Sequence, residues 1–144
     1  MSGDEDGFSL DSRLATDSHR VTDLGLSQVR LIDDARYDWL VLVPRVAGAV
    51  EWIDLAPAQQ HALIDEVARV GMALRAASRC EKLNIGALGN SVRQLHVHVL
   101  ARNTGDPAWP GPVWGASPLQ RRGDPAREAA VTVWRDALAA TRST

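Results

Sequence analysis

The segment from Gln94 to Leu100 constrains the fold of this chain more than any other. Its apolar residues Leu95, Val97 and Val99 alternate with the polar residues Gln94, His96 and His98. A period of two places the two sets on opposite faces of a β-strand. One face is therefore predicted to join a core, and the other carries two imidazoles. Because imidazole titrates near neutral pH, two neighbouring rings can share nucleophilic and proton-transfer work.

A His-x-His pair can also bind a metal ion. A closed site would need a third or fourth His, Cys or carboxylate at ligand spacing, and the nearest candidates are Cys80 and Asp106. The sequence therefore predicts no metal site, although a metal-dependent enzyme that uses the two histidines stays open as an alternative. His19 and His61 share no pattern with the pair, and we expect neither to belong to the site.

The rest of the chain predicts one α+β domain over residues 8–144. The expected elements are a short helix over 8–15 capped by Asp11, strands near 19–22, 27–32 and 39–43, a helix over 57–78, strands over 81–88 and 94–100, a loop rich in Trp and Pro at 106–115, and a helix over 124–140. This order is typical of an antiparallel sheet with a long helix and a C-terminal helix packed against it. Residues 1–7 are acidic and predict a solvated tail.

Charge and cysteine content argue against several classes of partner. The net charge is -2, and no run of Lys or Arg is longer than Arg121-Arg122, which argues against a nucleic-acid polymer. The single cysteine, Cys80, excludes an intrachain disulfide, and no apolar run approaches the roughly 18 residues of a membrane span. The start of the chain does not resemble a signal peptide. We therefore expect a cytoplasmic protein that does not bind membranes.

The motif Gln94-x-His96-x-His98 resembles that of the histidine triad (HIT) family, in which three histidines alternate with apolar residues. Gln94 stands where the family has its first histidine. Other agreeing features are the strand ending at Pro44, the long helix after it, the turn Gly89-Asn90-Ser91 before the motif and Arg102 after it. The resemblance covers about residues 8–115. It implies the family's α+β fold with an antiparallel sheet.

The resemblance also implies a function. It predicts a hydrolase or nucleotidyl transferase that acts at the α-phosphate of a nucleotide conjugate, such as a dinucleoside polyphosphate, a nucleoside phosphoramidate or an adenylylated compound. His96 would attack the phosphorus and form a nucleotidyl-histidine, with no cofactor or metal. His98 would direct positive charge or a hydrogen bond toward the phosphate, and the Ser91 hydroxyl would contact it. Gln94 can still donate a hydrogen bond but cannot transfer protons as imidazole can.

Four residues are candidates for substrate binding. By resemblance, Asp33 matches a residue that holds the ribose hydroxyls, although it can equally be a turn residue that only contacts solvent. Asn84 matches an amide near the phosphate, but the turn after it is one residue shorter than in the family. Gly89 and Asn90 would aim backbone N–H groups toward the phosphate, or form a plain hairpin loop.

Two further expectations follow from the resemblance. The family is commonly dimeric, and the apolar surface of Leu88, Trp109, Trp114 and Trp134 predicts a homodimer. The family also often has a fourth histidine before the proline, where this chain has Trp39. Because two proton-transferring groups are replaced, a nucleotide-binding module with weak or no turnover is the alternative function.

Overall fold

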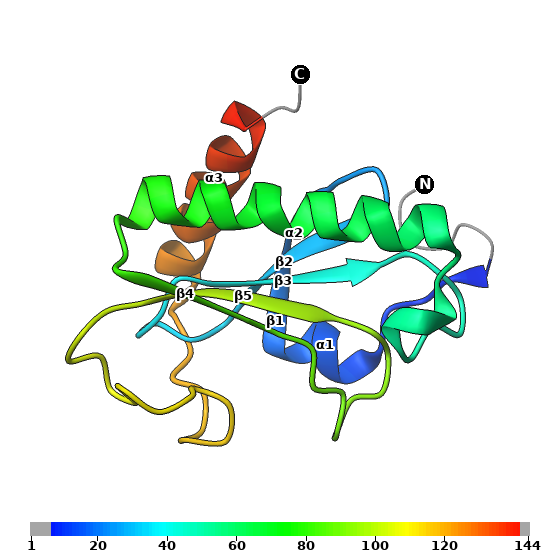
Figure 1. Cartoon of the computed structure of the whole chain (residues 1–144). Helices are drawn as coiled ribbons and strands as arrows, with labels where there is room; N and C mark the ends of the chain where they lie inside the picture. The colour runs from blue at the N-terminus through cyan, green and yellow to red at the C-terminus, as the bar shows by residue number, and fades with distance from the viewer. Residues whose placement is uncertain (1–6, 142–144) are drawn as a thin grey trace.

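The computed structural model describes residues 7–141 and is built on a five-stranded antiparallel sheet in the order β1-β2-β3-β5-β4 (Figure 1). The elements are α1 (Ser12–Asp17), β1 (Ser18–Asp23), β2 (Ser27–Ile32), β3 (Trp39–Pro44), the 3-10 helix η2 (Trp52–Asp54), α2 (Pro57–Ser78), β4 (Lys82–Gly86), β5 (Val97–Arg102) and α3 (Asp124–Ala140). The predicted α+β fold is confirmed. The predicted acidic tail lies outside the described residues except for Gly7.

One face of the sheet packs against α2 and α3 (Figure 1). The predicted spacing of α2 is confirmed, because Leu63, Val67, Val70 and Leu74 are all buried. They pack with Val97 and Val99 of β5 and with Trp134 and Leu138 of α3 in one core. The apolar half of the alternating motif therefore faces the helices. Its polar half must face the other side of the sheet.

The other face is covered by α1 and by the loop between β5 and α3 (Figure 1). Phe8 and Leu14 pack on Val43 near the N-terminal helix. Val113 and Trp114 of the loop pack on Trp39, Val41 and Leu100 of the sheet. The loop thus packs against the body of the same chain.

Arg102 holds this loop on the sheet. The side chain is only 1% exposed. Its guanidinium donates to both carboxylate oxygens of Asp106 at 2.7 and 2.9 Å, to Asn84 at 2.8 Å and to the carbonyl of Gly111 at 2.9 Å. It also lies over the ring of Trp109, 5.6 Å from the centroid. A buried cation with this many partners fixes both the sheet end and the loop.

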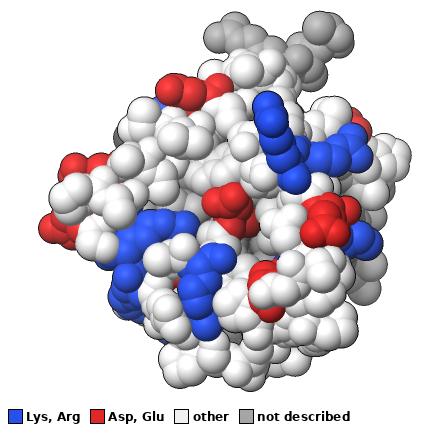
Figure 2. Space-filling model, turned by 90° about the vertical axis from the view of Figure 1, so that its left-hand side faces the viewer, with Lys and Arg blue, Asp and Glu red and all other residues white. Residues whose placement is uncertain are grey.

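The surface at the end where β4 begins mixes both signs of charge. In Figure 2, Lys and Arg side chains surround Asp and Glu side chains on this face. The view therefore shows no basic patch of the kind that tracks a phosphate backbone. Within residues 7–141, no helix is long and apolar enough to span a bilayer.

Candidate functional site

The two histidines lie at the end of the sheet where β5 begins. His98 is paired with Val41 of β3 on one side and with Gly86 of β4 on the other. His96 immediately precedes the strand, and the two rings are 5.0 Å apart between centroids at an interplanar angle of 74°. Both side chains are buried on the face away from α2. This arrangement agrees with the predicted alternation.

The hydrogen bond of His96 determines which nitrogen can react. Its Nδ1 lies 2.6 Å from the carbonyl oxygen of Gln94. A carbonyl oxygen only accepts, so Nδ1 must carry the proton and donate. In the neutral ring, Nε2 then keeps a free lone pair. His96 is therefore oriented and protonated as a nucleophile requires.

His98 is held in the opposite tautomer. The indole Nε1 of Trp39 donates to Nδ1 of His98 at 2.9 Å, and indole has no acceptor. Nδ1 must therefore be unprotonated, which leaves the proton on Nε2. Trp114 lies on another side of the ring, 5.6 Å between centroids, and packs over Gly86, where an added Cβ would be 3.2 Å from it.

This enclosure keeps His98 uncharged. Burial of the ring, with a smaller contribution from His96, lowers the pKa of His98 to about 3. Protonation would also break the Trp39 hydrogen bond, because Nδ1 would become a donor. Of the two roles expected for His98, the structure therefore favours a hydrogen bond from Nε2 over a positive charge.

Replacing Trp39 by Phe should raise the pKa of His98 only partly toward its ordinary value, because Phe removes the indole hydrogen bond but keeps much of the burial that is the main cause of the lowered pKa. In the parent, the unfolded chain binds a proton on His98 below about pH 6.5, whereas the folded chain excludes it down to about pH 3. Stability from this group is therefore present above pH 6.5 and is lost as the pH falls through that window. The free energy of unfolding of the variant should fall less than that of the parent as the pH drops from about 6.5 to about 3.

The measurement is a pH titration of the His98 ring signals by NMR, together with urea unfolding at several pH values. Trp114→Phe is the matched control, because Trp114 donates no hydrogen bond to His98 among the contacts of the described residues. An unchanged titration in Trp39→Phe would show that the indole hydrogen bond does not contribute to the lowered pKa of His98.

The side chain of Gln94 is turned away from His96. Its Oε1 accepts from the backbone N–H of Asp11, and its Nε2 donates to the carbonyl of Ser9, both at 2.8 Å. The amide thus fastens the N-terminal segment to the motif, and only the main-chain carbonyl serves His96. Gln94, predicted to be catalytic, thus lines the pocket beside His96 but has its side-chain amide bound to the N-terminal segment.

The turn before the motif is brought only partly into the site. Gly89 has a φ of 73°, a conformation that favours glycine, and it lines the same pocket as His96. Asn90 and Ser91 are exposed and do not line that pocket. The carbonyl of Ser91 accepts from Arg13 at 2.8 Å, which ties the turn to α1.

Asn84 lies further from His96 than its predicted role requires. It pairs with Leu100 across the two strands, and its side-chain oxygen accepts from Arg102. Since Leu100 is four residues after His96, Asn84 lies about 13 Å further along the strand direction.

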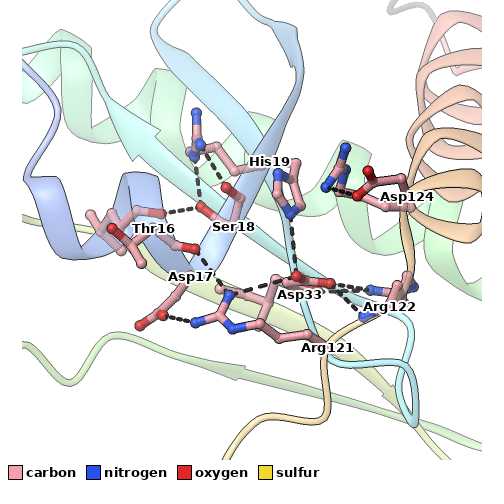
Figure 3. A network of polar contacts seen from close by, with 12 residues as sticks. Thr16, Asp17, Ser18, His19, Asp33, Arg121, Arg122 and Asp124 are labelled. Atoms are coloured by element: carbon pink, nitrogen blue, oxygen red, sulfur yellow. Dashed lines mark hydrogen bonds and ion pairs between the residues drawn. The ribbon is translucent and has the colours of Figure 1, made fainter.

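Asp33 lies beside His19, Arg121 and Arg122 (Figure 3). It follows Leu31 by two residues and so shares the helix-facing side with it. Leu31 is level with Val99 through β3, which places Asp33 about 17 Å from His96 along the strands. The structure therefore does not bring Asp33 to the histidines.

The Asp33 carboxylate already has protein partners. It accepts from the backbone N–H of Arg122 at 3.0 Å and lies 3.3 Å from Nε2 of His19 and 3.6 Å from Arg121. Burial raises its pKa, but the Arg122 N–H and His19 outweigh burial, so the pKa is lowered overall. The contacts join β1, the end of β2 and the segment that precedes α3.

Asp33→Asn should therefore leave the affinity for AMP unchanged and destabilise the fold by about 1–3 kcal/mol, the cost of weakening a buried charged hydrogen bond. Calorimetric AMP binding and urea unfolding measure the two effects. Asp65→Asn, on the exposed side of α2, is the control for loss of a carboxylate. Weaker AMP binding with unchanged stability would support the ribose contact predicted from the sequence.

A pocket of about 160 Å³ opens beside His96. Segments 50–52, 87–89 and 94–96 line it, so it lies between η2 and the turn that follows β4. Larger hollows of about 260 and 500 Å³ lie elsewhere and contain neither His96 nor His98. The segment at 50–52 carried no sequence signal, because only the path of the chain from β3 to α2 brings it to the histidines.

The residues that enclose His98 did carry a signal. Trp39 stands where the resemblance places a fourth histidine, and Trp114 belongs to the loop with two tryptophans.

No group of three or more His, Cys, Asp or Glu within residues 7–141 is arranged to hold a metal ion.

Comparison with protein families matches residues 13–105 to the HIT domain. A histidine triad protein from Sinorhizobium meliloti 1021 is 45% identical, with a TM-score of 0.87 over 90% of this chain and 96% of that one. One from Bradyrhizobium japonicum is 48% identical, with a TM-score of 0.86 over 90% and 97%. One from Marinobacter aquaeolei VT8 is 38% identical, with a TM-score of 0.88 over 94% and 98%. The comparison with curated proteins gave no match.

Proposed function

The chain belongs to the HIT domain family, which supports a nucleotide-related hydrolase or transferase activity, and from this premise we propose a reaction at the α-phosphate of a nucleotide conjugate. The observation that carries the proposal is the 2.6 Å contact from His96 Nδ1 to the Gln94 carbonyl. It leaves Nε2 of a rigidly held imidazole free to attack phosphorus. The intermediate is a nucleotidyl-His96.

The neighbouring groups supply hydrogen bonds rather than charge. Nε2–H of His98 lies on the same face as His96 and can donate to a non-bridging oxygen of the phosphate. Backbone N–H groups of the turn at Gly89 can donate from the other side. Donors fixed before the reaction stabilise the charge that develops on those oxygens. Water then hydrolyses the intermediate, or another acceptor takes the nucleotidyl group.

A nucleotide-binding module with weak or no turnover is the second candidate. Two observations favour it. The Gln94 amide is hydrogen-bonded to Ser9 and Asp11, and His98 is uncharged. The described site therefore has no second side chain beside His96 that readily transfers protons. Such a protein would bind AMP but would not turn over its conjugates.

The test is turnover across a panel of adenosine conjugates, each measured with and without a chelator. Hydrolysis that persists with the chelator supports the proposed function. AMP binding without turnover supports the binding module. Turnover that requires an added divalent metal ion would replace both with a metal-dependent reaction at the two histidines.

We also propose a homodimer formed along the edge of the sheet. Trp134 is only 4% exposed and Trp114 packs on its own chain, so neither offers the free surface expected from the sequence. Strand β4 is an edge strand, however, and carries Ile85 at 55% exposure, and Leu88, two residues beyond the end of the strand, is 46% exposed. An exposed apolar edge readily pairs with another strand. Sedimentation at micromolar concentration should give a dimer, which Ile85→Lys should dissociate, and a monomeric parent would contradict it.

A further inference from the structure

We infer that the site acts on mixed anhydrides between a nucleoside monophosphate and an apolar carboxylic acid. The inference rests on the proposed function and narrows it to one class of leaving group. Two independent features support it. The first is that the described site has no general acid near His96, and the second is the set of residues that line the pocket beside it.

The described site offers no acid that can protonate a leaving group. His96 is itself the nucleophile, and its Nδ1–H is bound to the Gln94 carbonyl. His98 is neutral with its proton on Nε2, and a neutral imidazole is a very weak acid. The amide of Gln94 and the indoles of Trp39 and Trp114 do not transfer protons.

A leaving group must therefore depart as a stable anion. An amine cannot do so, because it leaves a phosphoramidate only when it is protonated. A carboxylate or a phosphate can, because its conjugate acid is strong enough to stay ionised at neutral pH. The absence of a general acid therefore makes phosphoramidates poor substrates, whereas anhydrides remain possible substrates.

The pocket lining distinguishes between the two kinds of anhydride. Glu51 is its one charged residue among those described, and no Lys or Arg lines it. The nearby Arg13 is bound to the Ser91 carbonyl and paired with Asp11. A polyphosphate would bring several negative charges toward Glu51 with no lining cation to compensate, which raises its free energy of binding.

The remaining lining favours a hydrocarbon group. Val50, Trp52, Ala87, Leu88 and Leu95 supply apolar side chains. The volume of about 160 Å³ is smaller than the roughly 300–1,000 Å³ of pockets that enclose whole ligands. The pocket therefore holds one part of the substrate next to the phosphorus. An apolar acyl chain fits that position.

The reaction then balances without an acid. The Nε2 lone pair of His96 forms the N–P bond as the bond from phosphorus to the acyl oxygen breaks, and that electron pair leaves on the carboxylate. Water next forms a P–O bond, the N–P pair returns to Nε2, and the proton of water passes to solvent. The products are a nucleoside monophosphate, a carboxylate and a proton.

The absence of a general acid is tested with adenosine 5′-(aryl phosphates) whose phenols differ in acidity. Without a general acid, kcat/KM should fall as steeply with rising phenol pKa as the rate of attack by free imidazole on the same esters. We expect phenylacetyl adenylate to be hydrolysed at least 100-fold more efficiently than the phenethylamine phosphoramidate of AMP. A shallow dependence on the phenol, or comparable hydrolysis of the phosphoramidate, would overturn the inference.

The pocket is tested with phenylacetyl adenylate and diadenosine tetraphosphate. The parent should prefer the adenylate, and Glu51→Gln should shift the ratio of the two kcat/KM values about tenfold toward the tetraphosphate at low salt. Leu88→Lys, at an exposed position, should shift the ratio in the same direction. The control Asp65→Asn, on the exposed side of α2, should leave the ratio of the two kcat/KM values unchanged.

The outcomes distinguish failure of the inference from failure of the proposed function. A parent that prefers the tetraphosphate, or a ratio that Glu51→Gln and Leu88→Lys leave unchanged, refutes the inference and leaves the proposed function standing. A parent that hydrolyses none of these conjugates refutes the proposed function, and the inference with it.

Discussion

Replacing His96 by Ala should reduce turnover of every nucleotide conjugate by about 1,000-fold or more while AMP binds nearly as tightly as before. The imidazole acts mainly on the transition state and the covalent intermediate, so its loss has little effect on the ground state. We assign the nucleophile to His96 because its Nδ1 donates to the Gln94 carbonyl and its Nε2 is free. In His98 the Nδ1 instead accepts a hydrogen bond from Trp39, so its proton is on Nε2.

The measurement is transfer of a labelled α-phosphate to the protein. Brief incubation with substrate and denaturation at alkaline pH should place the label on a peptide that contains residues 94–102. His98→Ala is the matched control and should keep residual labelling. Label on the His96→Ala protein would refute the assignment. A parent that turns over substrate but never labels would indicate direct attack by water, with His96 as the base.

Replacing Arg102 by Met should destabilise the fold by about 3–5 kcal/mol, the usual effect of removing one partner from a buried ion pair. The change leaves the Asp106 carboxylate, the Asn84 oxygen and the Gly111 carbonyl without their common donor. The hydrogen bond from Arg102 is also the largest cause of the lowered pKa of Asp106.

Urea unfolding measures the loss, and tryptophan fluorescence should report the loop separately, because Trp109 lies against Arg102 and Trp114 follows it. Arg75→Met, exposed on α2, should change stability by less than about 0.5 kcal/mol. If Arg102→Met were as stable as Arg75→Met, Arg102 would not be the anchor of the loop.

Local periodicity predicted the elements of this fold because each signal depends on neighbouring residues. Leu63, Val67, Val70 and Leu74 identified α2, and the run ending at Pro44 identified β3. The ends were less well predicted. β4 stops at Gly86 rather than Leu88, because Gly86 pairs with His98 and the partner strand β5 begins at Val97, one residue earlier.

The site was predicted where it depends on alternation and missed where it depends on distant contacts. His96 and His98 follow from a period of two. The partners of Gln94, Ser9 and Asp11, are more than 80 residues away and have no local signature. Asp33 is instructive, because extending the period of two from Leu31 would have placed it on the helix-facing side and away from the histidines.

The bonds made by Gln94 restrict the mutational routes open to this protein. A single change to His would provide the third imidazole of the family motif, but a ring cannot reproduce the paired amide contacts to Ser9 and Asp11. That substitution would leave the segment that begins α1 held only by the Arg13 hydrogen bond to Ser91 and by the packing of Phe8 and Leu14. A third histidine is therefore most easily accommodated after the N-terminal segment has acquired another attachment.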